Sequence, residues 1–300
     1  MTTTEIDNPD VSAPKTGFIN FPRKCFLWVR SLPISGQIGV LILLFVLGTA
    51  LLGPLLAPYD PVSQSMLNRN KGFSAEHWFG TDAFGRDVFS RLVVGTRHTI
   101  LLTSSALLLS AGLGILIGLV AAYNRSNWID SLICWTMDIL LTFPMVIMGV
   151  VVVAILGQGT LNVGIAIAVA FLPRMVRMSR GVALTLVTSE FVEAARSIGA
   201  SPSRIVIRHL LPNVMIEMSS ISTLWLATAI KTETSLSFLG LGVQPPTPSW
   251  GLMVREGLST LYINAWPSLL PVIAIFITII GLNLVVDGTQ ESLNPNTKDH

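Results

Sequence analysis

Charged residues are scarce in this sequence. Asp, Glu, Lys and Arg make up only 12% of its 300 residues, while 51% are hydrophobic. A soluble domain carries roughly 25% charged residues, so the composition indicates that lipid rather than water surrounds most of the chain. The formal net charge of +2 is too small to argue for a nucleic-acid partner.

Cysteine and histidine are also scarce. Cys25 lies in the polar N-terminal segment at 1–36 and Cys134 in an apolar run, so we expect two free thiols rather than a disulfide. The four histidines show no ligand spacing with one another or with cysteine. We therefore predict that the chain has no metal site.

The glycine-rich loop that binds nucleotide phosphates is absent from the chain. Its pattern ends in Gly-Lys followed by Ser or Thr, and none of the five lysines follows a glycine. If ATP drives the activity of this protein, another chain hydrolyses it. We identify no catalytic residues, and we expect a non-enzyme without a cofactor.

Uncharged hydrophobic runs are what the sequence has in abundance. A hydrocarbon core of about 30 Å needs about 20 residues of helix. Runs near this length predict an all-α integral membrane protein with about six transmembrane helices, at 37–57, 99–123, 131–156, 160–178, 212–230 and 266–286.

Small residues and proline predict local features of these spans. Gly112, Gly114 and Gly118 provide positions where a neighbouring helix can approach closely. Phe143-Pro144 predicts a kink within the third span. The turn at 157–159, with two glycines, separates the third span from the fourth.

The stretch 189–213 is the longest one rich in charge and in local structure signals. Ser189 is a suitable N-cap, and Gly199 can end the helix that follows in a left-handed conformation. Ser201-Pro202 predicts the start of a second helix, which Leu211-Pro212 then stops. A compact apolar surface is expected on the first helix from Phe191, Val192, Ala194, Ala195 and Ile198.

The same stretch contains a motif with fixed spacing, in which Glu193-Ala194-Ala195 is followed by Gly199 and then by Leu211-Pro212. This motif resembles the EAA loop of the membrane subunits of ABC importers. His209 departs from that pattern, which has Ile there. The resemblance implies a cytoplasmic coupling helix that docks on an ATPase subunit, where the two alanines would let a groove in the partner approach closely. The residues that it implies for coupling are Glu193, Ala194, Ala195, Arg196, Gly199, Leu211 and Pro212.

A polar insert at 58–98 carries a second, longer match. It resembles the G-T-D-x-x-G-R-D-x-x-S-R-L signature of the dipeptide and oligopeptide branch of these permeases. By physics alone, the charged members could form an ion-pair network around a glycine-punctuated turn. We favour a role in bracing the insert against the membrane helices over contact with substrate. The signature residues are Gly80, Thr81, Asp82, Gly85, Arg86, Asp87, Ser90 and Arg91.

Residues 233–251 resemble another pattern of the same branch, L-S-F-L-G-x-G-x-x-P-P-x-P-x-W-G. Because Pro245, Pro246 and Pro248 rule out a continuous helix, we expect an ordered extracytoplasmic loop over this stretch. Asp287-Gly288 and the residues that follow resemble the C-terminal ending of the family.

The basic residues suggest how the chain is oriented. The cytoplasmic side is indicated by the basic end of the N-terminal segment and by Arg174, Arg177 and Arg180. We therefore expect an inner-membrane protein with both termini in the cytoplasm. The expected layout is a cytoplasmic segment at 1–36, a first transmembrane helix at 37–57, an extracytoplasmic insert at 58–98, an ABC transmembrane domain at 99–288 and a cytoplasmic tail at 289–300.

The resemblance implies a function as well as a fold. The chain would be a permease subunit with the type I ABC importer fold, moving a small solute by alternating access. Its implied partners are a second homologous permease subunit, two ABC ATPase subunits, an extracytoplasmic binding protein and membrane lipid. Di- or oligopeptides are the implied cargo, with nickel, glutathione or another small solute as alternatives.

Acids within or near the spans admit two interpretations. Asp138 and Glu217 could line the pathway or make polar contacts near a helix end, and we favour neither. Lys231 and Glu233 fit a membrane interface better than the pathway. No substrate-binding residue is identified.

Two other classes of function remain as alternatives. An ion-coupled secondary transporter would show inverted repeats and paired midplane acids, and we find neither. An intramembrane enzyme would need a nucleophile and a base at matched depth, but all four histidines lie outside the spans or at their edges.

Overall fold

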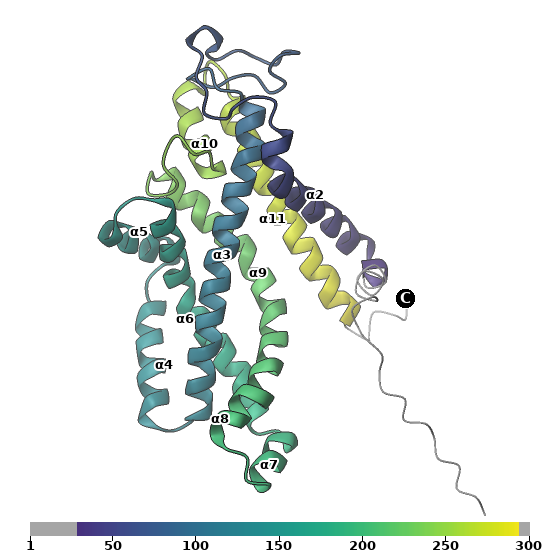
Figure 1. Cartoon of the computed structure of the whole chain (residues 1–300), viewed down its shortest axis with the longest axis vertical. Helices are drawn as coiled ribbons and strands as arrows, with labels where there is room; N and C mark the ends of the chain where they lie inside the picture. The colour runs from purple at the N-terminus through teal and green to yellow at the C-terminus, as the bar shows by residue number, and fades with distance from the viewer. Residues whose placement is uncertain (1–28, 294–300) are drawn as a thin grey trace, which may run out of the picture.

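The computed structural model describes residues 29–293, apart from the side chains of Ser220 and Leu293 (Figure 1). The head at 1–28, with Cys25 and the basic residues expected to mark the cytoplasm, and the tail from 294 onward lie outside the described residues. Residues 29–293 are helical apart from turns, loops and one isolated bridge between Thr81 and Asp87. The prediction of an all-α protein is confirmed.

Within residues 29–293, seven longer helices form the bundle, and short ones lie at its ends (Figure 1). The longer helices are α2 (Ile34–Leu56), α3 (Val88–Tyr123), α4 (Trp128–Leu141), α5 (Met145–Leu156), α6 (Thr160–Val187), α9 (Leu211–Phe238) and α11 (Trp266–Leu293). The short elements are η1 (Met66–Asn68), α7 (Glu190–Ser197), α8 (Pro202–Ile205), the π-helical turn η2 (Val206–Leu210), α10 (Trp250–Gly257) and η3 (Leu258–Thr260).

The two ends of the bundle carry different elements (Figure 1). One end, which we call the insert end, consists of residues 57–87 together with α10. The other, which we call the loop end, consists of residues 188–210 with α7 and α8. Helix α3 runs between these ends, and α2 packs beside α11.

In the part of the chain that the structure describes, four helices are long and apolar enough to cross a membrane, namely α2, α3, α6 and α11. The bent pair α4 and α5 adds a fifth crossing if the two helices are counted together. The fifth expected span, at 212–230, corresponds to α9, which has 28 residues but is more polar and is not among these candidates. Its polarity comes from Glu217, Lys231, Glu233 and several hydroxyl side chains.

The third expected span is broken rather than kinked. Helices α4 and α5 meet at an angle of 96°, so the prediction of one helix through Pro144 is wrong. Proline lacks the N–H that would continue the α4 ladder, and it disfavours helical geometry at the preceding Phe143. Pro144 instead stands at the N-cap of α5.

Helix α9 is longer than expected in both directions. Residues 231–238 are helical rather than part of a loop, since the prolines begin only at Pro245. At its other end, α8, η2 and α9 follow one another without a break, so Leu211-Pro212 does not stop the second helix. The Leu211 N–H bonds to the carbonyl of Val206, five residues back, and this wider turn precedes the proline.

Helix α3 begins within the segment expected to be a polar insert. Val88 is its first residue, eleven positions before the expected start of the span at Thr99. Asp87 is the N-cap, and its Oδ2 accepts a hydrogen bond from the Ser90 N–H at 2.8 Å. The signature sequence therefore folds partly as a turn and partly as the first turn of α3.

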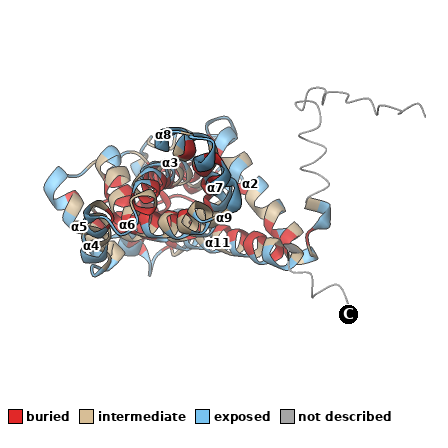
Figure 2. Ribbon diagram, turned by 90° about the horizontal axis from the view of Figure 1, so that it is seen from below, coloured by how far each residue is buried: buried red, intermediate tan, exposed pale blue. Residues whose placement is uncertain are grey.

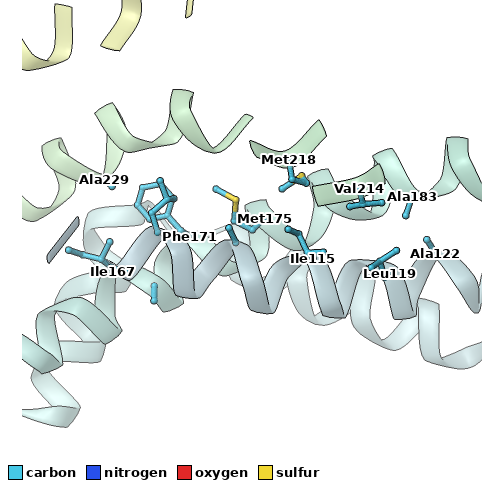
Figure 3. Packing of buried hydrophobic residues seen from close by; sticks show 14 of the residues in the cluster. Ile115, Leu119, Ala122, Ile167, Phe171, Met175, Ala183, Val214, Met218 and Ala229 are labelled. Atoms are coloured by element: carbon cyan, nitrogen blue, oxygen red, sulfur yellow. The ribbon is translucent and has the colours of Figure 1, made fainter. Parts of the chain in front are cut away.

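The largest buried cluster lies where α3, α6 and α9 meet (Figures 2 and 3). A methyl group added at Gly114 or Gly118 would overlap atoms of Met175 or Ser179 on α6, which confirms both predicted close approaches. The Ser179 hydroxyl donates to the Gly114 carbonyl at 2.7 Å. The prediction for Gly112 is wrong, since a methyl group there would meet no neighbouring atom within 4 Å.

Candidate coupling surface

Helix α7 and its flanking turns follow the sequence signals. Ser189 stands at the N-cap, although its hydroxyl donates to the Leu186 carbonyl instead of capping α7. Gly199 has a φ of +76°, the left-handed conformation predicted for it. The N–H groups of Gly199 and Ala200 bond to the carbonyls of Arg196 and Ala195, both at 3.0 Å, which is the paired arrangement that ends many helices.

The apolar side chains of α7 divide between two faces. Val192 and Ala195 are buried, while Phe191, Ala194 and Ile198 are exposed. The expectation that both alanines are open to a partner is therefore wrong for Ala195. Ala195 packs inward and Ala194 lies on the outer face, so of these two alanines a partner could contact Ala194 alone.

The inner face of α7 belongs to the main hydrophobic cluster of the bundle. Val192 and Ala195 share that cluster with Leu119 and Ala122 of α3 and with Ala183 of α6. Figure 3 shows Leu119, Ala122, Ala183 and Val214 together at one end of this packed row. A displacement of α7 would therefore press directly on the helices of the bundle.

The second half of the loop is continuous with a long helix. Ser201 and Pro202 occupy the N-cap and first positions of α8, as predicted. Ile205 and Leu210 are buried in the same cluster, and the helical backbone continues from Pro202 to Phe238. This continuity gives the loop a rigid connection to the insert end.

The outer face of the loop end is charged and open. Glu190, Glu193, Arg204 and Arg208 are exposed, and none of them forms a salt bridge within residues 29–293. The guanidinium of Arg196 lies 5.9 Å from the centre of the Tyr123 ring. This surface thus has unpaired charges of both signs around the exposed residues of α7.

At the insert end, three members of the signature form the predicted ion-pair network. The Arg86 Nε lies 2.6 Å from the Asp82 Oδ2, and the Arg91 Nε lies 3.6 Å from the same oxygen. Sequence reasoning missed the fourth member, Glu256 of α10. Its Oε2 accepts from both Arg86 and Arg91, each at 2.8 Å. The only sequence signal was an acid in an otherwise largely apolar short helix.

Asp87 does not join the two arginines as expected. Its Oδ1 contacts the His77 Nδ1 at 2.8 Å, and its Oδ2 also accepts from the Ser90 hydroxyl at 2.7 Å. The Ser90 hydroxyl in turn accepts from the Tyr59 N–H. Asp87 therefore ties the start of α3 to two separate parts of the insert.

Backbone contacts complete the insert end. A methyl group at Gly80 or Gly85 would overlap the carbonyl of Lys71 or Ser65, so chain segments cross where both glycines lie. The Thr81 hydroxyl donates to the Asn68 carbonyl. Asn264, which sequence reasoning also missed, donates to the Thr81 carbonyl at 3.2 Å and connects the insert to the segment before α11.

Three acids whose roles the sequence left open, Asp138, Glu217 and Glu233, lie in different environments. Asp138 is exposed and lies 3.4 Å from Arg177 of α6, a polar contact with another helix. Glu217 is exposed beside a groove between α6 and α9. A bidentate pair between Asp130 and Arg180, at 2.7 and 2.8 Å, was not foreseen.

Glu233 is fully buried rather than interfacial. Its Oε1 accepts from the Ser237 hydroxyl at 2.7 Å, while its Oε2 has no hydrogen-bond partner in the described part of the chain. Nearby, the Trp250 ring N–H donates to the Thr96 hydroxyl and its backbone N–H to the Thr99 hydroxyl. These buried polar contacts join α3 to α10 beneath the insert end.

Comparison with known proteins agrees with this architecture. A permease protein of the glutathione transport system, GsiD, from Shigella dysenteriae serotype 1 (strain Sd197) is 40% identical over 261 residues, covering 87% of this chain and 86% of that protein. The GsiD protein of Escherichia coli O157:H7 has the same identity and coverage. An inward-facing structure of the MetNI methionine ABC transporter matches with a TM-score of 0.53 at 20% identity, covering 68% of this chain and 96% of the matched chain.

The family of binding-protein-dependent transport system inner membrane components matches residues 114–299. That segment includes the whole loop end and most of the main buried cluster. Together with the relatives at 40% identity, it establishes that the chain belongs to this family and is the inner-membrane permease subunit of an ABC importer for a small solute.

Proposed function

We propose that this permease imports short peptides, with glutathione or a peptide of similar size as cargo. The proposal is supported by the relatives named for glutathione transport and by the signature at Gly80–Arg91 that resembles the peptide branch. The chain pairs with a second homologous permease subunit, and an extracytoplasmic binding protein delivers the cargo. Both termini lie in the cytoplasm.

Two ABC ATPase subunits drive the transport, and the loop end receives their motion. The observation that carries this proposal is the division of α7 into a buried face with Val192 and Ala195 and an exposed face with Phe191, Ala194 and Ile198. An amphipathic helix that packs inward and still exposes apolar side chains suits a groove in a partner. Glu193 and Arg196 flank that face. Gly199 ends α7, and Leu211-Pro212 lies where the loop continues into α9.

Alternating access then follows from the continuity of the chain. Closure of the ATPase pair would displace α7, and the rigid segment from α8 through α9 would carry the displacement toward the insert end. Such a contact changes the equilibrium between states only if the partner binds one state more tightly.

The test is Ala194→Glu in the complex reconstituted with its ATPase subunits and binding protein. A bulky charge on the exposed face should leave the amount of inserted permease unchanged and reduce ATP-driven peptide uptake at least tenfold, as expected for loss of about 1.4 kcal/mol or more of docking energy. Ala75→Glu, the same change at an exposed alanine of the insert, is the matched control.

Uptake and ATPase activity are measured together. Full uptake by the Ala194→Glu complex would contradict the docking role of α7. Peptide uptake by the permease without any ATPase subunit would contradict the mechanism as a whole and favour a secondary transporter. Ala195→Asp is a poorer test, because Ala195 is buried and its replacement would disturb the bundle as well.

A further inference from the structure

A groove of about 480 Å³ lies between α6 and α9, next to the loop end. Thr185 and Leu186 come from the last turn of α6, and Asn213 from the first turn of α9. Glu217 lines the same groove one turn further along α9. Its volume is within the range of small-molecule sites, and its lining combines apolar with polar side chains.

The carboxylate of Glu217 has no counterion in the described part of the chain. It forms no salt bridge within residues 29–293. Two cations of α6 are already engaged elsewhere, Arg177 with Asp138 and Arg180 with Asp130. An acid on a helix of a membrane bundle faces a wet cavity or a partner, and here it faces the groove.

The groove is also open where a glycine lines it. Gly181 of α6 is exposed, and a methyl group added there would meet no atom within 4 Å. By contrast, Gly114 and Gly118 are each covered by a neighbouring helix. The space beside Gly181 is therefore unfilled by residues 29–293 and can accept another group.

We propose that this groove is a cargo site at the loop end of the pathway, where Glu217 binds the ammonium group of a peptide. The Thr185 and Asn213 side chains offer hydrogen bonds nearby, and the apolar wall accommodates the uncharged part of the peptide. This inference rests on the proposed import of short peptides. It assigns to Glu217 the role of recognising a positively charged end of the cargo before release.

The experiment uses the full complex with both native cysteines replaced by serine and a single new thiol from Gly181→Cys. The rate at which a water-soluble maleimide labels this thiol reports whether the groove is occupied. S-methylglutathione, which has an ammonium group but no thiol, is the probe, and its N-acetyl derivative carries a neutral acetamide in place of the ammonium group.

We expect S-methylglutathione to slow labelling severalfold and the N-acetyl derivative to have little effect. Adding Glu217→Gln should raise the half-protecting concentration roughly tenfold, since a hydrogen bond between charged groups contributes about 1.5–3 kcal/mol. Glu291→Gln, at an exposed acid of α11, should leave that concentration unchanged.

Three results would overturn the inference: equal protection by the N-acetyl derivative, no effect of Glu217→Gln, or a thiol that reacts in the isolated permease but not in the complex. The last would show that another subunit fills the groove. ATP-driven uptake of S-methylglutathione by the unmodified complex tests the proposed function separately. Uptake without protection of the thiol would contradict the groove alone, and absence of uptake would contradict peptide import.

Discussion

At the insert end, one carboxylate oxygen of Glu256 accepts hydrogen bonds from two buried arginines. Gly80 and Gly85 are each in close contact with the backbone of another chain segment. At the loop end, four charged side chains of residues 190–208 are exposed and unpaired, and Gly199 lies in open space. Internal contacts fix the geometry of the insert end. The loop end is fixed on one face only, which leaves its other face for a partner. Substitutions at the insert end should therefore affect folding, whereas those at the loop end should affect coupling.

The largest effect should come from Glu256→Ala. Removing this carboxylate leaves Arg86 and Arg91 buried with only Asp82 as an acidic partner. Breaking a buried ion pair in this way costs about 3–5 kcal/mol. We expect a large loss of folded permease from membranes and a clear fall in the melting temperature of the purified protein. Glu291→Ala on the exposed surface of α11 is the control.

Unchanged thermal stability of the Glu256→Ala protein would contradict the bracing role of the network. The charge-neutral Glu256→Gln sharpens the test, because its amide oxygen can still accept one hydrogen bond. Its loss of stability should be smaller than that of the alanine variant.

The next effect should come from Gly85→Ala. Gly85 has a φ of +71°, and a methyl group there would overlap the Ser65 carbonyl. The backbone must shift to relieve this overlap, and such overpacking costs about 1–3 kcal/mol in addition to about 1–2 kcal/mol for the left-handed conformation. Thermal unfolding of the purified protein in detergent measures the sum. A melting temperature equal to that of the unchanged protein would show that the crossing is looser than the structure indicates.

Gly118→Ala tests the middle of the bundle against its own internal control. A methyl group at Gly118 would overlap the Ser179 side chain and the backbone of α6, whereas one at Gly112 meets nothing within 4 Å. We expect Gly118→Ala to destabilise the protein by about 1–3 kcal/mol. Gly112→Ala should be neutral or stabilise it by up to about 1 kcal/mol through helix propensity. Equal melting temperatures for the two variants would contradict the packing of α3 on α6.

These glycines show how far sequence reasoning extends. Spacing alone flagged Gly112, Gly114 and Gly118 as equivalent, because all three interrupt one apolar run. Which of them meets α6 depends on how α3 is rotated in the bundle, and that rotation is set by contacts between residues far apart in the chain. The same limit hid Glu256, which lies 165 residues from Arg91 along the chain.

Local signals fared better where the backbone itself responds to them. The left-handed Gly199 and the start of α8 at Ser201-Pro202 both depend on the preferences of one or two residues. At Pro144 the sequence located the bend, although not the full break of the helix. The prediction failed at Leu211-Pro212. We expected this proline to end the helix, but a π-helical turn just before it lets the helical backbone continue. It also failed at Ala195, since that alanine is buried against the bundle while its neighbour Ala194 is exposed.

At the loop end, Gly199→Ala should affect folding less than the changes at the insert end. Gly199 shares the positive φ of Gly85, yet a methyl group there meets no atom within 4 Å. Only the conformational cost of about 1–2 kcal/mol remains, and it falls on a turn at the surface. Asn tolerates this conformation better than Ala, so Gly199→Asn should retain more of the native turn. We expect both variants to insert normally, with ATP-driven uptake lower for Gly199→Ala than for Gly199→Asn. If the two variants transported equally but both melted far below the unchanged protein, the loop end would be braced as firmly as the insert end, and the contrast between the two ends would be wrong.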